Sequence, residues 1–298
     1  MLKVENVSKS YGTLKAVDNL SFEVADGEIF GLLGVNGAGK TTTFRMIIGL
    51  LEKDSGTITL DGKPIDYSVT DKIGFLTEER SLLLKLTVKE QVIYYGILKG
   101  MKEEDILRKL DYFLERLKIT DYKDKKIKEL SKGNQQKVQF ITAIINEPKL
   151  LILDEPFSGL DPLNVDLFMT IIKELKSKGT SIIFSSHRME HVELFCEKLL
   201  ILVHGKSVLQ GNLHEIKKQF GKKNIHIVGD VDIEKLKDID GVLAVEENSE
   251  IIVKVKDDTV VPKVFSYVAK QKNITKFCVE EATLNEIFIE KVGEAYEK

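Results

Sequence analysis

The glycine-rich run from Gly34 to Thr41, which reads Gly-Val-Asn-Gly-Ala-Gly-Lys-Thr, constrains the fold of this chain more than any other segment. It fits the pattern G-x-x-x-x-G-K-[ST] without a gap. Apolar residues at 29–33 predict a strand before it, and apolar residues at 44–48 predict a helix after it that ends near Gly49. A strand, a glycine-rich turn and a helix in this order form a loop that binds phosphate, because backbone N–H groups and the helix N-terminus face the same anion.

Each part of this loop has an expected task. Lys40 can reach the β- and γ-phosphates of a nucleotide, and the hydroxyl of Thr41 can hold Mg²⁺, with Thr42 as the second candidate. The backbone around the anion comes from the six residues before the lysine: Gly34, Val35, Asn36, Gly37, Ala38 and Gly39. A chance glycine-rich turn is the alternative that the loop alone leaves open.

Composition limits the class of protein. The 298 residues allow one large domain or two smaller ones, and a hydrophobic fraction of 43% supports a substantial core. A formal net charge of -3 argues against binding of nucleic acid through bulk charge. The two cysteines, Cys196 and Cys278, have no metal-ligand spacing and indicate buried thiols in a reducing compartment. There is no leader-peptide pattern and no apolar run near the ~20 residues of a bilayer span, so we expect a cytoplasmic protein.

The pattern along residues 1–221 predicts an α/β domain. Alternating strands over 1–33 predict an antiparallel β subdomain, and a charged helical stretch predicts a helical subdomain at about 87–147. Apolar strands at 150–153 and 181–185 have a helix between them. Continuous apolar strands that alternate with helices predict a parallel core sheet.

Residues 222–298 follow a change of pattern and are expected to form a small accessory domain of the α+β class. The predicted order is strand, helix, strand, strand, helix, strand, which is typical of the ferredoxin-like split βαβ fold. The expected elements are strands at 224–228, 242–246, 251–256 and 274–279 and helices at 233–237 and 260–270. A final helix around Leu284 and Ile287 closes the chain.

A second strong motif is the apolar strand at 150–153 followed by Asp154, Glu155 and Pro156. A strand that ends in aspartate places a carboxylate at the C-terminal edge of the sheet, where it can hold Mg²⁺ beside a phosphate. Asp154 is therefore the expected metal ligand, and Glu155 is placed to polarise an attacking water. Taken alone, the motif could also be two acidic residues at an ordinary strand end.

Three shorter motifs are ambiguous when each is taken alone. Ser131 and Gly133 lie in the run Leu-Ser-Lys-Gly-Asn, where the serine could simply cap the following helix. Asp161 lies in Ser-Gly-Leu-Asp-Pro, which by itself indicates only a turn. His187 follows a predicted strand, a place where most histidines serve only surface or packing roles.

In their order and close spacing, these motifs resemble the ATP-binding cassette (ABC) family of ATPases over roughly residues 1–215. The resemblance implies a P-loop NTPase cassette fold, ATP as the substrate and Mg²⁺ as the cofactor. It implies that Glu155 is catalytic and that His187 is the switch histidine that contacts the γ-phosphate. It also implies that the ring of Tyr11 stacks on adenine.

The family signature Leu-Ser-Gly-Gly-Gln occurs here with Lys132 and Asn134 in its third and fifth places. Ser131 and Gly133 are retained, and in the family they contact the γ-phosphate bound by the facing subunit. Asp161 matches the D-loop aspartate of the family.

A further departure concerns the loop after the strand predicted at 72–76, where the family has a glutamine. Glu78 takes that position, in the run Thr-Glu-Glu-Arg. A carboxylate can still bind Mg²⁺, because hard cations prefer charged oxygen, but it cannot donate the hydrogen bond of an amide. Glu78 is therefore a candidate metal ligand.

The resemblance implies that two cassettes, as a homodimer, hold ATP between them. A single cassette without spans is expected to serve a separate transmembrane permease from the inner face of the cell membrane. The apolar segment at 78–95 is the expected docking groove, with ordinary core packing as the alternative. The accessory domain and the tail at 282–289 resemble the ATPases of bacterial sodium-efflux and drug-efflux exporters, and so favour export.

Three other functions compete with this one. They are a non-transport ABC ATPase with a regulatory or nucleic-acid-associated role, a nucleotide or small-molecule kinase, and a cassette that binds ATP but barely hydrolyses it. The interval from Lys40 to Ser131 is too short for the coiled coils of DNA-repair members, and we expect no nucleic-acid partner. A kinase has no task for His187, and Glu155 argues against an inactive cassette.

Overall fold

The computed structural model describes residues 1–66, 69–79 and 81–297 of the chain. The chain divides into two compact units, Met1–Gln210 and Gly211–Lys298. Within the described residues, every helix is too short or too polar to cross a bilayer. Arg80, the last residue of the Thr-Glu-Glu-Arg run, lies outside the described residues.

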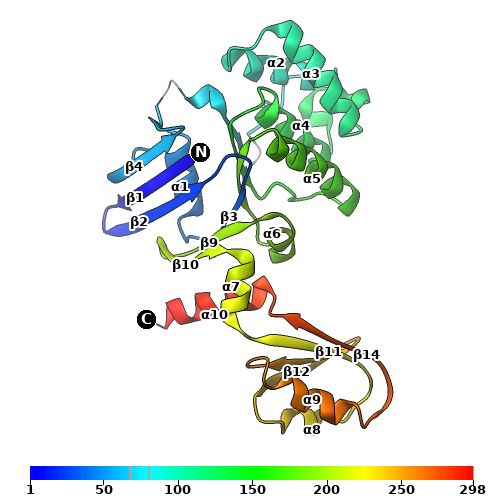
Figure 1. The fold of residues 1–298 in the computed structure, drawn as a ribbon. Coiled ribbons are helices and arrows are strands. Elements are labelled where there is room, and N and C mark those ends of the chain that lie inside the picture. The colour runs from blue at the N-terminus through cyan, green and yellow to red at the C-terminus, as the bar shows by residue number, and fades with distance from the viewer. Residues whose placement is uncertain (67–68, 80, 298) are drawn as a thin grey trace. The chain divides into compact units, whose positions relative to one another are not determined.

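The first strands of the N-terminal unit form an antiparallel sheet in the order β2-β1-β4-β5, as predicted (Figure 1). These strands are β1 (Leu2–Tyr11), β2 (Leu14–Val24), β4 (Ser55–Leu60) and β5 (Lys63–Pro64). Leu2 and Val4 are buried and alternate with more exposed residues, as expected for a strand with one face in the core. Helix α1 (Lys40–Ile47) packs into the same core through Phe44.

A six-stranded sheet in the order β10-β9-β3-β8-β7-β6 forms the centre of this unit. The pairs β9/β3, β3/β8, β8/β7 and β7/β6 are parallel, which confirms the predicted parallel core. The strands are β3 (Ile29–Gly34), β6 (Ile73–Leu76), β7 (Leu150–Asp154), β8 (Ser181–Ser185), β9 (Lys198–Val203) and β10 (Lys206–Asn212). Every residue of β3, β7 and β8 is buried, because other elements cover both faces of the sheet.

Three helices lie together in the stretch predicted to be helical (green in Figure 1). They are α2 (Val88–Leu98), α3 (Glu103–Arg116) and α4 (Lys132–Ile144). Helix α3 buries Ile106, Leu110 and Leu114 on one face, as their helical spacing predicts. Helices α5 (Pro162–Ser177) and α6 (Met189–Phe195) follow β7 and β8. Short 3-10 turns are η1 (Thr70–Lys72), η2 (Thr120–Tyr122) and η3 (Ile127–Glu129).

The C-terminal unit has a four-stranded sheet in the order β12-β13-β11-β14, in which all neighbours are antiparallel. Its strands are β11 (Lys223–Asp230), β12 (Val242–Glu247), β13 (Ile251–Val255) and β14 (Lys272–Glu281). Its helices are α7 (Leu213–Phe220), α8 (Ile233–Lys237), α9 (Val261–Val268) and α10 (Leu284–Tyr296). Ile225, Ile227 and Val253 pack with Leu236 of α8 and Val264 of α9 in a separate core. The element order from β11 to β14 is the predicted ferredoxin-like one.

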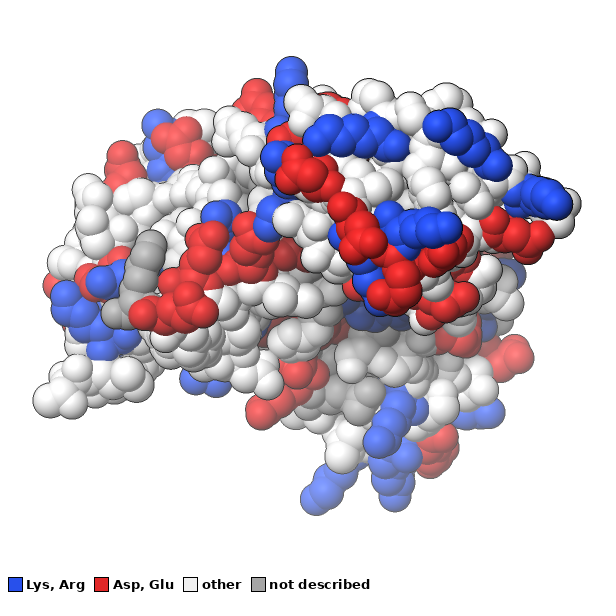
Figure 2. Space-filling model, turned by 90° about the horizontal axis from the view of Figure 1, so that it is seen from below, with Lys and Arg blue, Asp and Glu red and all other residues white. Residues whose placement is uncertain are grey.

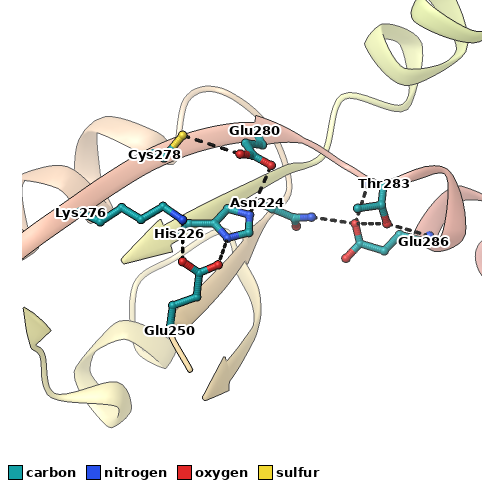
Figure 3. Close-up of polar contacts among 8 residues, drawn as sticks. All are labelled: Asn224, His226, Glu250, Lys276, Cys278, Glu280, Thr283 and Glu286. Carbon is teal, nitrogen blue, oxygen red and sulfur yellow. Dashed lines mark hydrogen bonds and ion pairs between the residues drawn. The ribbon is translucent and has the colours of Figure 1, made fainter. Parts of the chain in front are cut away.

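A network of polar side chains lies along this sheet (Figure 3). Nδ1 of His226 lies 2.7 Å from the carboxylate of Glu250. Asn224 donates a hydrogen bond of 2.8 Å to Glu286, whose carboxylate also accepts from the backbone N–H of Thr283 at 2.9 Å. Glu286 therefore both caps the start of α10 and ties this helix to β11.

Two details differ from what the sequence suggests. Helix α7 belongs to the C-terminal unit, so the division falls between Gln210 and Gly211, whereas the pattern change suggested a boundary after residue 221. Cys196 is buried as expected, but Cys278 is only partly buried. Cys278 pairs in register with His226, a polar residue, so its side of the strand is not part of the apolar core.

Candidate functional site

The predicted loop, three carboxylates and a histidine line one cavity of about 330 Å³. The cavity lies at the C-terminal edge of the parallel sheet, because β3 leads into the loop and β7 ends at Asp154. Ligands of α/β sheets bind at this edge. The lining residues are Tyr11, Leu14, Lys15, Ala16, Asn36, Gly37, Ala38, Gly39, Lys40, Thr41, Thr42, Glu78, Asp154, Glu155, His187 and His204.

Lys40 begins α1, and its side chain folds back over the loop. Its Nζ donates hydrogen bonds to the carbonyl oxygens of Gly34 at 2.6 Å and Val35 at 3.2 Å. Burial lowers the pKa of Lys40, and the charges of Asp154 and Glu155 oppose this shift. The loop therefore has a cation at its centre, close to the acidic end of the cavity.

Backbone crowding explains why glycines bound this loop. At Gly39, where φ is +109°, a Cβ atom would lie 2.3 Å from the carbonyl oxygen of Ala16. At Gly34 a Cβ atom would lie 2.5 Å from the carbonyl oxygen of Leu202. The backbone of neighbouring strands thus lies close to both ends of the loop, and neither position has room for a side chain.

Asp154 ends β7 and is only 5% exposed. Its Oδ1 accepts a hydrogen bond of 2.6 Å from Oγ of Ser185, which ends the adjacent strand β8 in register. Burial raises the pKa of Asp154, and the bond from Ser185 opposes that shift. A cation beside this carboxylate would favour its ionised form, which is the form that a metal ligand needs.

Glu155 follows in a left-handed backbone conformation with φ of +50°. Its side chain is 13% exposed, and burial raises the pKa of Glu155 to about 7, with the charges of Asp154 and Glu78 adding to the shift. Oε1 lies 3.6 Å from Nε2 of His187 and makes no hydrogen bond to any described residue. A carboxylate with a pKa near neutrality and an unengaged oxygen suits proton abstraction from water.

The donor set at this end of the cavity fits Mg²⁺. No three His, Cys, Asp or Glu side chains among the described residues are placed to hold a metal by themselves. In phosphate-transfer sites, however, Mg²⁺ takes one or two carboxylates and completes its shell with phosphate oxygens and water. Asp154, the exposed Glu78 and the hydroxyl of Thr41 line the same cavity and are all hard oxygen donors.

Five predicted site residues are not among those that line this cavity: Gly34 and Val35 at the start of the loop, and Ser131, Gly133 and Asp161. Ser131 is exposed and caps α4 by accepting a 3.3 Å hydrogen bond from the backbone N–H three residues later. Asp161 is exposed and caps α5 in the same way, at 3.0 Å. A Cβ atom on Gly133 would lie 3.6 Å from the carbonyl oxygen of Gly159, so the start of α4 adjoins the turn before Asp161.

The rest of the cavity lining was only partly predicted. Tyr11 ends β1 and is 49% exposed in the cavity, as a stacking residue requires. No motif pointed to Leu14, Lys15, Ala16 or His204, which also line the cavity. His204 precedes a glycine, which marks a turn, but nothing in the sequence indicates that this turn lies beside the loop.

Comparison with known proteins covers both units. A model of the ABC transporter family matches residues 17–158, and a model of the C-terminal domain of DrrA1-3-like ATP-binding proteins matches residues 211–292. The chain is 50% identical over 298 residues to the ABC transporter ATP-binding protein YhaQ of Bacillus subtilis (strain 168), with 100% of both chains covered. It is 35% identical over 232 residues to the Nod factor export ATP-binding protein I of Sinorhizobium fredii (strain NBRC 101917 / NGR234), covering 76% of this chain and 68% of that one.

The fold of the chain is similar to that of a solved structure. It is a dimeric ATP-binding cassette in a post-hydrolysis state, bound to ADP and Pi. The TM-score is 0.67 and the identity is 26%, with 72% of this chain and 99% of that chain covered.

Proposed function

Because this chain belongs to the ATP-binding proteins of ABC transporters, we propose that its cavity hydrolyses ATP and that hydrolysis drives transport through a separate membrane subunit. The observation that carries the proposal is that the phosphate-binding loop, Asp154, Glu155 and His187 line one cavity. Phosphoryl transfer to water needs positioning and charge neutralisation more than covalent chemistry. Fixed charges and backbone N–H groups around a closed site supply both.

At the binding end of the cavity, the loop from Gly34 to Lys40 holds the phosphates and Tyr11 stacks on adenine. The hydroxyl of Thr41 and the carboxylate of Asp154 hold Mg²⁺, with Thr42 and Glu78 as further oxygen donors. When it is bound, Mg²⁺ neutralises phosphate charge.

At the reacting end, Glu155 accepts a proton from the attacking water. His187 contacts the γ-phosphate. Support for these roles comes from the 3.6 Å separation of the two side chains and from the raised pKa of Glu155. A base whose pKa lies near the working pH transfers protons most effectively.

Two copies of the chain form the working unit in this proposal. Ser131 and Asp161 are exposed and Gly133 is half-buried, all outside their own cavity, so they are available to a second copy. ATP contacted from both sides favours the closed pair by its higher affinity for that state. That a similar cassette was solved as a dimer with ADP and Pi supports this arrangement.

A membrane subunit is the proposed partner at the inner face of the cell membrane. Leu83, Leu84 and Tyr94 lie in the predicted docking segment and are 41%, 50% and 49% exposed. Ile97 and Leu98 extend this apolar surface along the end of α2. Large apolar side chains exposed together mark interaction surfaces. The similarity to a Nod factor export protein supports export as the direction.

The charge pattern of the face shown in Figure 2 does not favour nucleic-acid binding. Figure 2 shows acidic and basic side chains interspersed over the face in view, without a continuous basic stripe among the described residues there. Binding to a phosphate backbone relies on such a stripe. We therefore propose proteins, rather than nucleic acid, as the partners.

The Glu155→Gln variant tests the proposal. Glutamine keeps the size of the side chain but cannot accept the proton, so ATP turnover should fall by roughly 100-fold or more. ATP should then stay bound and hold two copies together. Light scattering with saturating ATP and Mg²⁺ should report a dimer, and without nucleotide a monomer.

A double variant provides the control. Adding Lys40→Ala to Glu155→Gln weakens phosphate binding and should return the protein to a monomer at the same ATP concentration. A Glu155→Gln protein that binds ATP and stays monomeric would show that the two-sided site is wrong.

A further inference from the structure

Helix α4 carries two buried glutamines that reach the loops on either side of the reacting end of the cavity. Gln136 is 2% exposed, and its Nε2 donates a 2.9 Å hydrogen bond to the carbonyl oxygen of Pro156. Pro156 is the residue directly after Glu155. The bond therefore fixes the backbone that carries the proposed catalytic base.

Gln139 lies three residues further along the same helix and is 5% exposed. Its Nε2 donates to the carbonyl oxygen and to Oγ1 of Thr77, each at 3.0 Å, and lies 3.4 Å from the carbonyl oxygen of Glu79. These acceptors flank Glu78, the candidate metal ligand. The amide thus holds the Glu78 loop from both sides.

In the side-chain amide of Gln139, the nitrogen makes hydrogen bonds and the oxygen makes none within the described part of the chain. Its Oε1 is buried and has no hydrogen-bond partner among the described residues. A buried polar atom without a partner is unfavourable and rare, so such a side chain is retained for what its other atoms do. Here those atoms are the two N–H donors directed at the Glu78 loop.

The helix connects these bonds to the surface proposed to face a second copy. Ser131 caps the N-terminus of α4, and Gly133 lies in its first turn. From Ser131 to Gln139 the helix spans about 12 Å at 1.5 Å per residue. A helix of this length moves as one body, so a shift at its start also shifts both glutamines.

We propose that Gln136 and Gln139 are positioning residues that couple the start of α4 to the loops carrying Glu155 and Glu78 in the same chain. The inference rests on the proposed function, in which Ser131 and Gly133 contact the nucleotide of a second copy. Nucleotide in the partner's cavity then adjusts the base and the metal loop of this chain's own cavity. The two sites consequently hydrolyse ATP cooperatively.

The test compares Gln136→Leu and Gln139→Leu with a matched variant of the same helix, Lys137→Met. Leucine and methionine approximate the volumes of the residues they replace but donate no hydrogen bond. Lys137 is 5% exposed and donates a 2.9 Å bond to the carbonyl oxygen of Leu117, which is remote in sequence from every predicted site residue. Its hydrogen bond touches neither loop, and its charge acts on Asp161 at the start of α5, so it reports the effect of losing a buried donor from α4 outside both loops.

We expect the two leucine variants to lower kcat about tenfold and to bring the Hill coefficient for ATP from above 1 to about 1. Affinity for ATP measured without Mg²⁺ should change less than about twofold, because the phosphate-binding loop is untouched. Gln139→Leu should also raise the Mg²⁺ concentration for half-maximal activity, since the Glu78 loop loses its anchor. Lys137→Met should keep the wild-type kcat and Hill coefficient.

The possible results distinguish a failure of the proposed coupling from a failure of the proposed ATPase function. If the wild type hydrolyses ATP cooperatively and the leucine variants match Lys137→Met, the coupling is wrong and the proposed function stands. A wild type that neither hydrolyses ATP nor pairs overturns both. If the leucine variants do not fold, the isosteric Gln136→Glu and Gln139→Glu replace them, and wild-type kinetics in these would equally overturn the coupling.

Discussion

At the scale of single residues, Glu155 shows how burial creates chemistry that composition does not reveal. An exposed glutamate is fully ionised at neutral pH and is a weak base. Burial raises the pKa of Glu155 to about 7, so its affinity for a proton is much higher at the same pH. The positive φ of the residue and the bond from its backbone N–H to the carbonyl oxygen of Ser185 keep it at this position.

This raised pKa predicts the pH dependence of turnover. Only the ionised form of Glu155 can accept a proton, so kcat/KM should rise about tenfold per pH unit below pH 7 and level off above it. Steady-state ATPase measurements between about pH 5.5 and 8.5 would show this profile. A His187→Gln variant is the control, because its residual activity should keep the inflection if Glu155 is the titrating group. An inflection near the ordinary pKa of glutamate would contradict the assignment.

At the scale of elements, the turn between β9 and β10 joins the two walls of the cavity. The N–H of Gly205 donates to the carbonyl oxygen of Ala38 in the phosphate-binding loop at 3.0 Å. The carbonyl oxygen of Gly205 accepts from the N–H of Asp18 on β2 at 2.8 Å. The hairpin formed by β1 and β2 carries Tyr11, so this turn sets the spacing between the adenine wall, as we name the wall that carries Tyr11 in the proposed function, and the phosphate-binding loop.

Gly205→Ala should therefore weaken nucleotide binding. The residue has φ of +76°, and a Cβ atom would lie 2.9 Å from the carbonyl oxygen of Ala16, so the hairpin must shift. We expect the Kd for ATP to rise roughly five- to tenfold, equivalent to about 1 kcal/mol. Isothermal titration calorimetry should show a smaller rise in the Kd for inorganic tripolyphosphate, because this ligand contacts the phosphate-binding loop but has no adenine.

A glycine elsewhere in the same unit supplies the matched control. Gly62 has φ of +74°, and a Cβ atom there would meet no atom of a described residue within 4 Å, so Gly62→Ala adds similar backbone strain without a clash. Gly62→Ala should leave the ratio of the Kd for ATP to the Kd for tripolyphosphate at its wild-type value. Equal weakening of ATP and tripolyphosphate binding by Gly205→Ala would show that the turn does not position the adenine wall.

At the scale of the whole molecule, the two units bury separate hydrophobic clusters that draw on different residues. One core in the N-terminal unit combines the antiparallel sheet, α1 and strands of the parallel sheet. The core of the C-terminal unit lies between its own sheet and helices α8 and α9. All described residues that line the proposed ATP cavity belong to the N-terminal unit.

Calorimetry of the full chain should therefore show two transitions, only one of which responds to nucleotide. Ligand at 100 times its Kd stabilises the unit that binds it by about 2.7 kcal/mol. For a unit of about 210 residues this shifts Tm by roughly 5–10 °C. ADP with Mg²⁺ avoids turnover during the scan and should raise the transition of the N-terminal unit alone. A single transition, or an equal rise in both, would contradict separate folding of the two units.

Local patterns in the sequence predicted the elements well. The strands and helices of residues 222–298 occur in the predicted order, and helix α8 occupies the predicted residues 233–237. The parallel core, the loop before α1 and the Asp154 strand end also lie where apolar runs and glycines placed them. Such features depend on residues within a few positions of each other, so the spacing of apolar residues along the sequence predicts them directly.

What this sequence determined by itself is the order of its motifs, and with it the fold and the roles that we propose for the loop, Asp154 and Glu155. Only the tertiary structure placed His204 and Ala16 in the lining of the cavity, and only it set the bonds of Gln136 and Gln139 to their loops. The raised pKa of Glu155 was also decided only by the tertiary structure, because it depends on burial by segments far along the chain. Contacts and desolvation arise when distant segments pack together, and a pattern of neighbouring residues carries no record of them.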